Sequence, residues 1–469
     1  MLLFDICINP LLHTLDEKLT GVKIGRRSTG VAAVAYADDV TVFLSTQDDV
    51  QQFQEAIRTY EAASGARVNT AKSKALALGG WDDSRAIMDI PYCQKIKILG
   101  YHFSDKVNNA SKETWSNTTS QVRAAAQNAY YRELSLDMRI KYVHDYLLAR
   151  IWYVAHIFPI PAENLRQLNT TSSWFIWRGE IFRVPLSTLH RGRDEGGYDL
   201  VNIWAKCMAI FIHRTQMHNK TVGSLNAAWL ATWDITTHAA NPPFRGKIPA
   251  SLEYIREYVI QSAYVRNRKD SESEKTYKKY LYTTMKDLCN AGTMHREMRI
   301  MKIWPHAEWE TIWGNLQATP VSDTVKSTWY RVIHDIIPTN YRLHRINMST
   351  SASCSECGGT DTLEHRLTEC GEGFDSWEQT RSVIARILRS SAACIPNEWL
   401  LRPSFRLWPT QRQRAVLWVL AQFVYYRLNR PRILSRHDLM DFLRRAKWKL
   451  YRQPHRSTKV ANFLIVIDT

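Results

Sequence analysis

Two adjacent carboxylates, Asp38 and Asp39, stand in a pattern that could bind divalent metal ions. The apolar, β-rich runs 31–36 and 40–44 flank them, so a tight hairpin is predicted with both carboxylates at its tip. Mg²⁺ takes one or two carboxylates together with phosphate oxygens of a substrate, and nucleotidyl transfer uses two such ions about 4 Å apart. An ordinary turn is the alternative, because Asp also favours turns through local hydrogen bonds, and the tip residues alone favour that alternative.

A Cys/His group with the spacing C-x2-C-x7-H-x4-C forms a second candidate site. Its members are Cys354, Cys357, His365 and Cys370. Three thiolates and one imidazole complete a tetrahedral Zn²⁺ shell, so the pattern predicts a closed, structural zinc site rather than a catalytic one. Free thiols in a reducing compartment are the alternative. The isolated cysteines are predicted to be buried apolar side chains: Cys7, Cys93, Cys207, Cys289 and Cys394.

Basic residues near the C-terminus form a third candidate site, for the phosphates of nucleic acid. It comprises Arg427, Arg430, Arg444, Arg445, Lys447 and Lys449. On helices such charges usually form a solvated face, which is the alternative, but few acidic residues accompany them here. Phosphate contact predicts an affinity for RNA or DNA that falls steeply with salt.

The charge of the whole chain favours the same kind of partner. Its 62 Lys and Arg against 45 Asp and Glu give a net charge of +17, which attracts a polyanion, although a merely basic surface is the alternative. Hydrophobic residues at 45% exclude an intrinsically disordered chain. No run approaches the roughly 20 apolar residues of a membrane span, and no signal peptide is evident, so an intracellular protein without a membrane partner is expected.

A small unit over residues 1–105 must position the carboxylates. A helix over 1–15 is expected to bury one side that includes Ile6 and Leu15. A second helix should follow the carboxylate hairpin. Strand-like pieces are predicted after it, at 66–69, 74–78 and 96–103.

The second helix is predicted from about residue 47 to 63. Thr46 can cap its first turn, Asp48 and Asp49 suit its positive N-terminal end, and Gly65 stops it. From about residue 110 onward the sequence is mainly helical and aromatic.

Four elements in this order resemble the reverse transcriptases of non-LTR (LINE-type) retrotransposons. They are the opening MLLFDICINPLL, the YADD hairpin, Asn69-Thr70-Ala71-Lys72-Ser73 and Ile98-Leu99-Gly100-Tyr101. The resemblance implies that Asp38 and Asp39 bind Mg²⁺ and that Lys72 lies near the triphosphate. It also implies contacts with the primer or the nucleotide for Tyr36, Leu99 and Gly100.

Three later segments carry the same resemblance. Residues 354–370 resemble the zinc knuckle that lies C-terminal to these polymerases, and 329–346 resemble its helical lead-in. Residues 174–200 resemble the region after the palm, where a thumb-like helical part is expected. Trp174 and Trp177 in that region are predicted to be core side chains rather than platforms for bases.

The implied fold is α+β, with a partial reverse-transcriptase palm followed by a mostly α-helical thumb and C-terminal region that contains a small zinc knuckle. The expected regions are a palm at 1–105, a helical thumb-like region at 106–240, a helical and charged connector at 241–325, a zinc-knuckle module at 326–385 and a basic helical region at 386–469.

The implied activity is RNA-directed DNA polymerisation with Mg²⁺ and structural Zn²⁺, on RNA and DNA as template and primer, in the nucleus. The family's other metal-binding aspartate and its fingers precede the segment with which this chain opens. We therefore expect an N-terminally truncated chain that is inactive alone and is completed by the missing N-terminal polymerase portion. A non-catalytic RNA- or DNA-binding protein derived from a retroelement is the alternative, and a translated pseudogene is a third. No restriction-like endonuclease is predicted, because no Pro-Asp with a following acidic-x-Lys occurs after Cys370.

Overall fold

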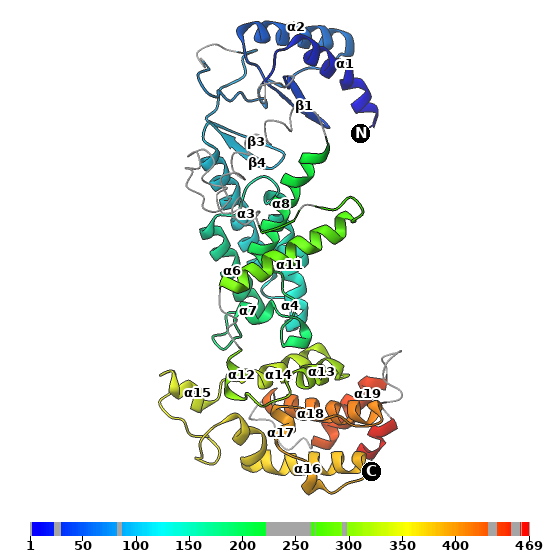
Figure 1. The fold of residues 1–469 in the computed structure, drawn as a ribbon. Coiled ribbons are helices and arrows are strands. Elements are labelled where there is room, and N and C mark those ends of the chain that lie inside the picture. Colours follow the sequence, from blue (N-terminus) through cyan, green and yellow to red (C-terminus); the bar gives the residue numbers. More distant parts are fainter. Residues whose placement is uncertain are drawn as a thin grey trace. The chain divides into compact units, whose positions relative to one another are not determined.

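The structure is a computed structural model, which divides into two compact units (Figure 1). Unit 1 comprises Met1–Val122, Ala149–Leu168 and Ile203–Gly292, and unit 2 comprises Arg123–Leu148, Asn169–Asn202 and Thr293–Thr469. The residues that the structure describes are 2–22, 30–81, 87–221, 264–266, 268–292, 298–429, 439–451, 460 and 462–468.

Helices make up most of the described residues, and unit 1 adds two small antiparallel sheets, which confirms the α+β class. The division into five regions stays a prediction. Within the described ranges, none of the helices combines the length and the apolar character that a membrane crossing requires.

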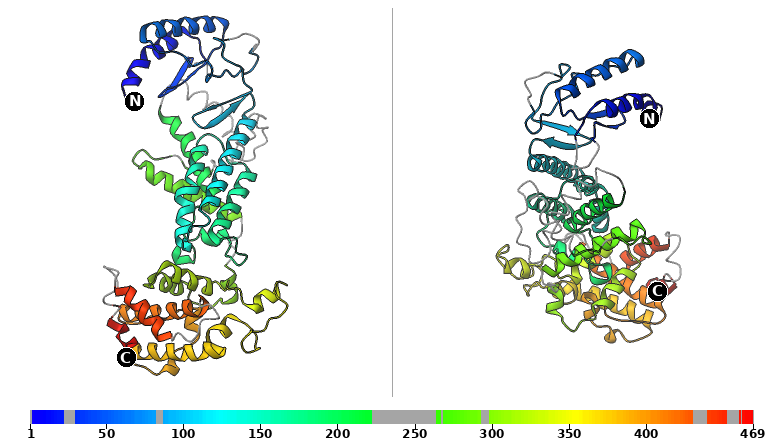
Figure 2. Two further views of the ribbon diagram at one scale, coloured as in Figure 1. Left: turned by 180° about the vertical axis from the view of Figure 1, so that it is seen from behind. Right: turned by 45° about the horizontal axis from the view of Figure 1, so that its top comes forward.

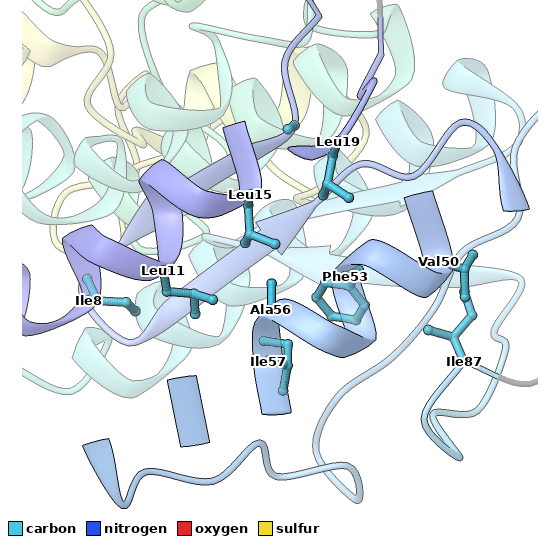
Figure 3. Packing of buried hydrophobic residues seen from close by; sticks show 10 residues of the cluster. Ile8, Leu11, Leu15, Leu19, Val50, Phe53, Ala56, Ile57 and Ile87 are labelled. Carbon is cyan, nitrogen blue, oxygen red and sulfur yellow. The ribbon is translucent and has the colours of Figure 1, made fainter. Parts of the chain in front are cut away.

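Helices α1 (Leu2–Lys18) and α2 (Gln47–Ser64) enclose the core next to the first hairpin. Figure 3 shows the facing side chains, which are Ile8, Leu11, Leu15 and Leu19 against Val50, Phe53, Ala56 and Ile57. The prediction for Leu15 is confirmed, whereas the prediction for Ile6 is wrong, because that side chain is 61% exposed. Ile8 is buried instead. Side chains two positions apart in an α-helix point about 200° away from each other, so Ile6 and Ile8 lie on opposite sides of α1.

Both ends of α2 form as predicted. The Asp49 N–H donates to the Thr46 hydroxyl at 3.0 Å, and the Thr46 N–H donates back to the Asp49 carboxylate at 3.2 Å, so the two residues make a capping box. Gly65 ends the helix with φ +71, and its N–H donates to the carbonyl oxygen of Glu61. The first turn of α2 is thereby fixed directly after the hairpin.

Two hairpins supply the described strands. Strands β1 (Ala33–Tyr36) and β2 (Asp39–Val42) pair antiparallel, as do β3 (Lys95–Ile98) and β4 (Tyr101–Ser104). The first hairpin matches the prediction for the carboxylates. The second hairpin occupies the predicted stretch 96–103 and turns within it.

The other strand predictions are wrong within the described residues. Residues 66–69 form no strand, because the Val68 N–H donates to the Glu61 carboxylate at 2.7 Å and so makes no ladder. Of residues 74–78, Ala75 alone pairs, in an isolated bridge with Tyr92.

Helices complete unit 1. They are α3 (Val107–Ala129), whose first turns lie there, α5 (Ala149–Val154), the start of α6 (Ala162–Trp177), α8 (Ile203–Thr221) and α11 (Glu274–Gly292). Helices α8 and α11 pack through fully buried side chains that include Met208, Ile212, Tyr277 and Leu281. This packing forms a helical core separate from the cluster of α1 and α2.

Unit 2 consists mainly of helices in its described part, with an isolated antiparallel bridge between Ser353 and Thr360. Its elements are α4 (Leu136–Tyr142), η1 (Val143–Leu147), α7 (Leu186–Leu189), η2 (Arg193–Glu195), α12 (Arg299–Ile303), α13 (Trp309–Ala318), α14 (Asp323–Ile333), α15 (Asn340–Arg345), η4 (His365–Glu369), α16 (Gly371–Leu388), η5 (Ala392–Cys394), α17 (Glu398–Leu401), α18 (Thr410–Asn429), α19 (Leu439–Tyr451) and η6 (Asn462–Ile467). Residues 415–424 of α18 are buried on every side, and α14, α16 and α19 pack around this helix (Figure 2).

Candidate active site and metal centre

The turn of the hairpin that carries the two carboxylates has only two residues, and Asp39 begins strand β2 directly after it. The β1–β2 ladder closes with Tyr36 opposite Asp39, so Ala37 and Asp38 alone form the turn. Ala37 has φ +52, the left-handed value that the first central position of a type II′ turn takes. Side chains alternate along a strand, and Val40 packs on the helical cluster. Tyr36 and Asp39 therefore project from the opposite, outer face of the hairpin.

This arrangement suits a hard cation. Asp38 and Asp39 are exposed, and Tyr36 beside them is 63% exposed. Within the described ranges, a group of three or more His, Cys, Asp or Glu ligands occurs around Cys354 and not around the hairpin. Two adjacent carboxylates fit Mg²⁺ when substrate phosphates, water or a further carboxylate complete the shell.

Lys72 lies in a separate turn and not on a strand. Its N–H donates to the carbonyl oxygen of Asn69 at 3.1 Å, and Ser73 contacts the same oxygen through its N–H and its hydroxyl. The Asn69 side chain accepts a further bond from the Lys72 N–H. Asn69 thus fixes the turn, and the exposed Lys72 side chain is accessible to an anionic ligand.

The Leu99–Gly100 turn closes the second hairpin. Both residues have positive φ, +48 and +90, which is the pattern of a type I′ turn. The Tyr153 hydroxyl of α5 donates to the carbonyl oxygen of Leu99 at 2.8 Å, and the Tyr101 hydroxyl donates to the carbonyl oxygen of Tyr153 at 2.5 Å. The sequence gives no signal for Tyr153, because it lies 54 residues from Leu99.

The Cys/His group comes together as a compact cluster in unit 2. Its four ligand atoms lie within 4.8 Å of one another. Cys354 Sγ lies 3.8 Å from Cys370 Sγ, and Cys357 Sγ lies 3.2 Å from His365 Nε2. Zn–S bonds of about 2.3 Å in a tetrahedron separate two sulfurs by about 3.8 Å, so the geometry of this cluster fits zinc.

Local backbone geometry brings the ligands into place. The Cys354 N–H donates to the carbonyl oxygen of Gly359, and Gly358 turns the chain with φ +76. The π-helical segment η4 begins at His365, and the Cys370 N–H donates back to its carbonyl oxygen at 2.9 Å. Single π-turns are frequent at functional sites, because the wider turn redirects side chains.

Neighbouring groups support this cluster. His365 Nδ1, on the far side of the ring from Cys357, lies 3.6 Å from the Glu369 carboxylate, which resembles the carboxylate–histidine pairs beside zinc. Burial alone would raise the pKa of the Cys354 thiol, but the N–H groups of Glu356 and Cys357 help to lower it to about 7. A low thiol pKa favours the thiolate that binds metal.

A buried ion pair connects this cluster to the surrounding helices. Arg366 donates through two nitrogens to the Asp361 carboxylate, which is 1% exposed and also accepts the Asn340 N–H at 2.6 Å. Arg427 of α18 donates to the carbonyl oxygen of Arg366 at 3.1 Å. The sequence did not indicate Asp361 or Arg366, because neither belongs to the ligand spacing.

The isolated cysteines differ from their prediction. Cys207 is buried as predicted, and burial raises its pKa. The prediction is wrong for Cys7 and Cys394, which are exposed, because they lie on the outward sides of α1 and η5. Cys93 and Cys289 are partly buried.

The basic residues near the C-terminus do not share one surface. Arg444, Arg445 and Lys449 are exposed on α19. Lys447 on the same helix is 5% exposed and pairs with the Asp468 carboxylate. Arg427 is partly buried and donates to the carbonyl oxygen of Arg366 beside the Cys354 cluster, and Arg430 lies outside the described residues.

Comparison with known proteins agrees with the hairpin and its surroundings. Residues 1–103 match the family model of reverse transcriptase (RNA-dependent DNA polymerase). A segment of 221 residues is 27% identical to the "Transposon TX1 uncharacterized 149 kDa protein" of Xenopus laevis. The match covers 46% of this chain and 17% of that protein. The carboxylate hairpin lies inside the matched segment, so residues 1–103 are similar to reverse transcriptases.

Proposed function

We propose that this chain is the palm, thumb and zinc-knuckle portion of a non-LTR (LINE-type) retrotransposon RNA-directed DNA polymerase. The observation that carries the proposal is the two-residue turn between Tyr36 and Asp39, which exposes two adjacent carboxylates within the segment that matches reverse transcriptases. Bound Mg²⁺ would supply charge neutralisation for nucleotidyl transfer at this tip. RNA and DNA are its template and primer, and the nucleus, where chromosomal DNA lies, is its expected location.

The other residues of unit 1 have binding roles in this proposal. Lys72, exposed on its own turn, neutralises the triphosphate of the incoming nucleotide. Tyr36, on the same outer face as Asp39, packs beside the primer terminus or the nucleotide. The rigid turn of Leu99 and Gly100, held by Tyr153, positions the primer strand.

We further propose that the chain alone extends no primer. Two-metal chemistry requires carboxylates that bridge both ions, and the two aspartates come from a single hairpin. The additional carboxylate would come from a strand outside this hairpin. In unit 2, the Cys354 cluster would hold one structural Zn²⁺ and form the zinc knuckle.

Primer extension tests this proposal. The purified chain with Mg²⁺, deoxynucleotides and a primed RNA template is expected to incorporate nothing. Addition of the fingers and first palm segment of a LINE-type polymerase is expected to give extension, which Asp38→Asn removes. Template-dependent incorporation by the chain alone would contradict the need for a carboxylate from elsewhere. Extension that survives Asp38→Asn would contradict the role of the hairpin.

A non-catalytic RNA- or DNA-binding protein is the second candidate. The net charge of +17 and the exposed Arg444, Arg445 and Lys449 on α19 favour it. It predicts salt-dependent binding, and the triple variant with Gln at these positions should reduce the slope of log affinity against log salt by about 0.9 per lost phosphate contact on duplex DNA. Nucleic-acid binding without any complemented extension would favour this candidate over the first.

A further inference from the structure

Two exposed tyrosines of unit 2 each contact a second aromatic ring. Tyr131 is 88% exposed and meets Tyr130 edge-on, with ring centroids 5.4 Å apart. Tyr130 in turn stacks on Trp174 of α6 at 4.7 Å and 16°. An exposed ring on a rigid aromatic support loses little conformational entropy when it binds a flat ligand.

The second exposed ring belongs to the π-helical segment η1. Tyr146 is 62% exposed and stacks on Tyr142 at 4.9 Å and 20°. Tyr142 also contacts Phe175 of α6 at 5.4 Å. Both supported tyrosines are therefore anchored on the last turns of the same helix, through Trp174 and Phe175.

Two arginines join these aromatic pairs. The Arg132 guanidinium lies over the Tyr142 ring, 5.6 Å from its centroid. Arg178 donates to the carbonyl oxygen of Arg132 at 2.7 Å, and the Tyr130 hydroxyl donates to the carbonyl oxygen of Arg178 at 3.3 Å. We call this set the tyrosine–arginine surface: Tyr130, Tyr131, Arg132, Tyr142, Tyr146 and Arg178.

Positive charge is in excess around this surface. Arg139 is partly buried, and its burial together with the nearby Arg178 and Arg331 lowers its pKa to about 10. Glu180 is the acid near these guanidiniums, and it pairs with Arg331. Crowded guanidiniums of this kind are stabilised by an anionic ligand.

The exposed acids of the same segments do not reverse this balance. Asp145 contacts His144 Nδ1 at 2.8 Å, and Glu133 is exposed to solvent beside Arg132. The three carboxylates of Asp145, Glu133 and Glu180 are outnumbered by four guanidiniums, which belong to Arg132, Arg139, Arg178 and Arg331.

We propose that the tyrosine–arginine surface binds single-stranded nucleic acid, with bases stacked on Tyr131 and Tyr146 and phosphates held by Arg132 and Arg178. Flat exposed rings next to guanidiniums match the two components of a single strand, its bases and its backbone. A duplex offers its phosphates, but its bases are already paired and stacked. This surface lies outside residues 1–103, so it would be a second nucleic-acid-binding site, separate from the carboxylate hairpin. Nucleic acid as the class of ligand rests on the proposed function.

Fluorescence anisotropy with labelled oligo(dT) and oligo(rU) of about 20 nucleotides, without Mg²⁺ or deoxynucleotides, tests the inference on the full chain. Tyr131→Ala and Tyr146→Ala are each expected to weaken binding about tenfold. Tyr131→Trp should restore the affinity, because it restores a stacking face. Arg132→Gln should reduce the salt slope by about 0.7, the value for one phosphate on a single strand.

The matched control is Tyr264→Ala, because Tyr264 is also 62% exposed but belongs to unit 1. It should bind like the unchanged chain, and circular dichroism should show the same fold for all variants. Unchanged affinity in both tyrosine variants would overturn the inference, as would an equal loss of affinity for duplex DNA. The assay measures binding without catalysis, so failure of the polymerase proposal would not alter its result.

Discussion

The Tyr153 hydroxyl donates a 2.8 Å hydrogen bond to the carbonyl oxygen of Leu99, which fastens the turn of the second hairpin to helix α5. The Tyr101 hydroxyl donates to the carbonyl oxygen of Tyr153, and the two rings lie 4.7 Å apart. Burial raises the pKa of Tyr101, so its hydroxyl stays protonated as a donor. Leu99 and Gly100 both have positive φ, and the hydrogen bond from Tyr153 of α5 stabilises the turn that they form.

Tyr153→Phe should loosen this turn. The variant keeps the ring contact but loses one hydrogen bond, which contributes about 1 kcal/mol. Hydrogen exchange at the amides of Leu99 and Gly100 should become several-fold faster, while exchange in α2 stays the same. Equal protection of the turn in both proteins would show that the tyrosine does not hold it.

Asp49 should make the N-terminal part of unit 1 sensitive to acid. Burial alone would raise the pKa of this carboxyl, but N–H donors that include Thr20 and Ser45 lower it below 3.8. A lowered folded pKa means that the carboxylate stabilises the fold above about pH 4, and that this stabilisation is lost as the pH falls through the lowered pKa.

Asp49→Asn should therefore destabilise α2 by about 2 kcal/mol at pH 7, and the difference from the unchanged protein should shrink below pH 4. Hydrogen exchange of α2 measures it. Asp48→Asn is the control, because Asp48 is exposed in the same first turn and should cost much less. A difference that is independent of pH would contradict this account.

The Cys354 cluster should bind one zinc ion per chain. Cys357→Ser should lower the zinc content measured by inductively coupled plasma spectrometry. Cys394→Ser should leave it unchanged, because that exposed cysteine lies outside the cluster. Structural zinc contributes on the order of 10–16 kcal/mol, so chelation should raise hydrogen exchange over 354–370 and spare α8 and α11. Protein prepared without chelator that contains no zinc would refute the assignment.

Gly196 should tolerate no side chain. It has φ +83, and a Cβ there would lie 2.5 Å from the ring of Trp313, which is 1% exposed. That ring stacks on His334 at 5.0 Å and has little room to move. Gly196→Ala should therefore destabilise unit 2 by about 2 kcal/mol or more, measured by thermal unfolding.

Gly314→Ala provides the matched control for this prediction. Gly314 lies one residue after Trp313 within α13, and a Cβ there would meet nothing within 4 Å. The alanine should be neutral or stabilise the helix by up to about 1 kcal/mol. An equal change of melting temperature in the two variants would contradict a steric conflict between a side chain at Gly196 and Trp313.

Local signals allowed much of the fold and site to be predicted. The capping box of Thr46 and Asp49, the stop at Gly65 and the turn before Asp39 each depend on residues within a few positions. The CCHC spacing is similarly local and predicted the cluster around Cys354.

What could not be predicted depends on distant packing. The bond from Tyr153 to Leu99 spans 54 residues, and no periodic pattern links them. Lys447 looked like its neighbours in sequence, yet its position on the inner side of α19 buries it against Asp468. Ile6 shows the same limit, because the choice of the buried side of α1 depends on α2.

The central claim is that Asp38 and Asp39 form a cation site at the hairpin tip, and iron-mediated cleavage tests it most directly. Fe²⁺ with ascorbate and peroxide generates radicals that cut the backbone near a bound cation. Cuts are expected close to residues 36–40, and Mg²⁺ should suppress them by competition, whereas Asp38→Asn with Asp39→Asn should abolish them. Cuts that are absent from this hairpin, or that persist in the double variant, would contradict this claim.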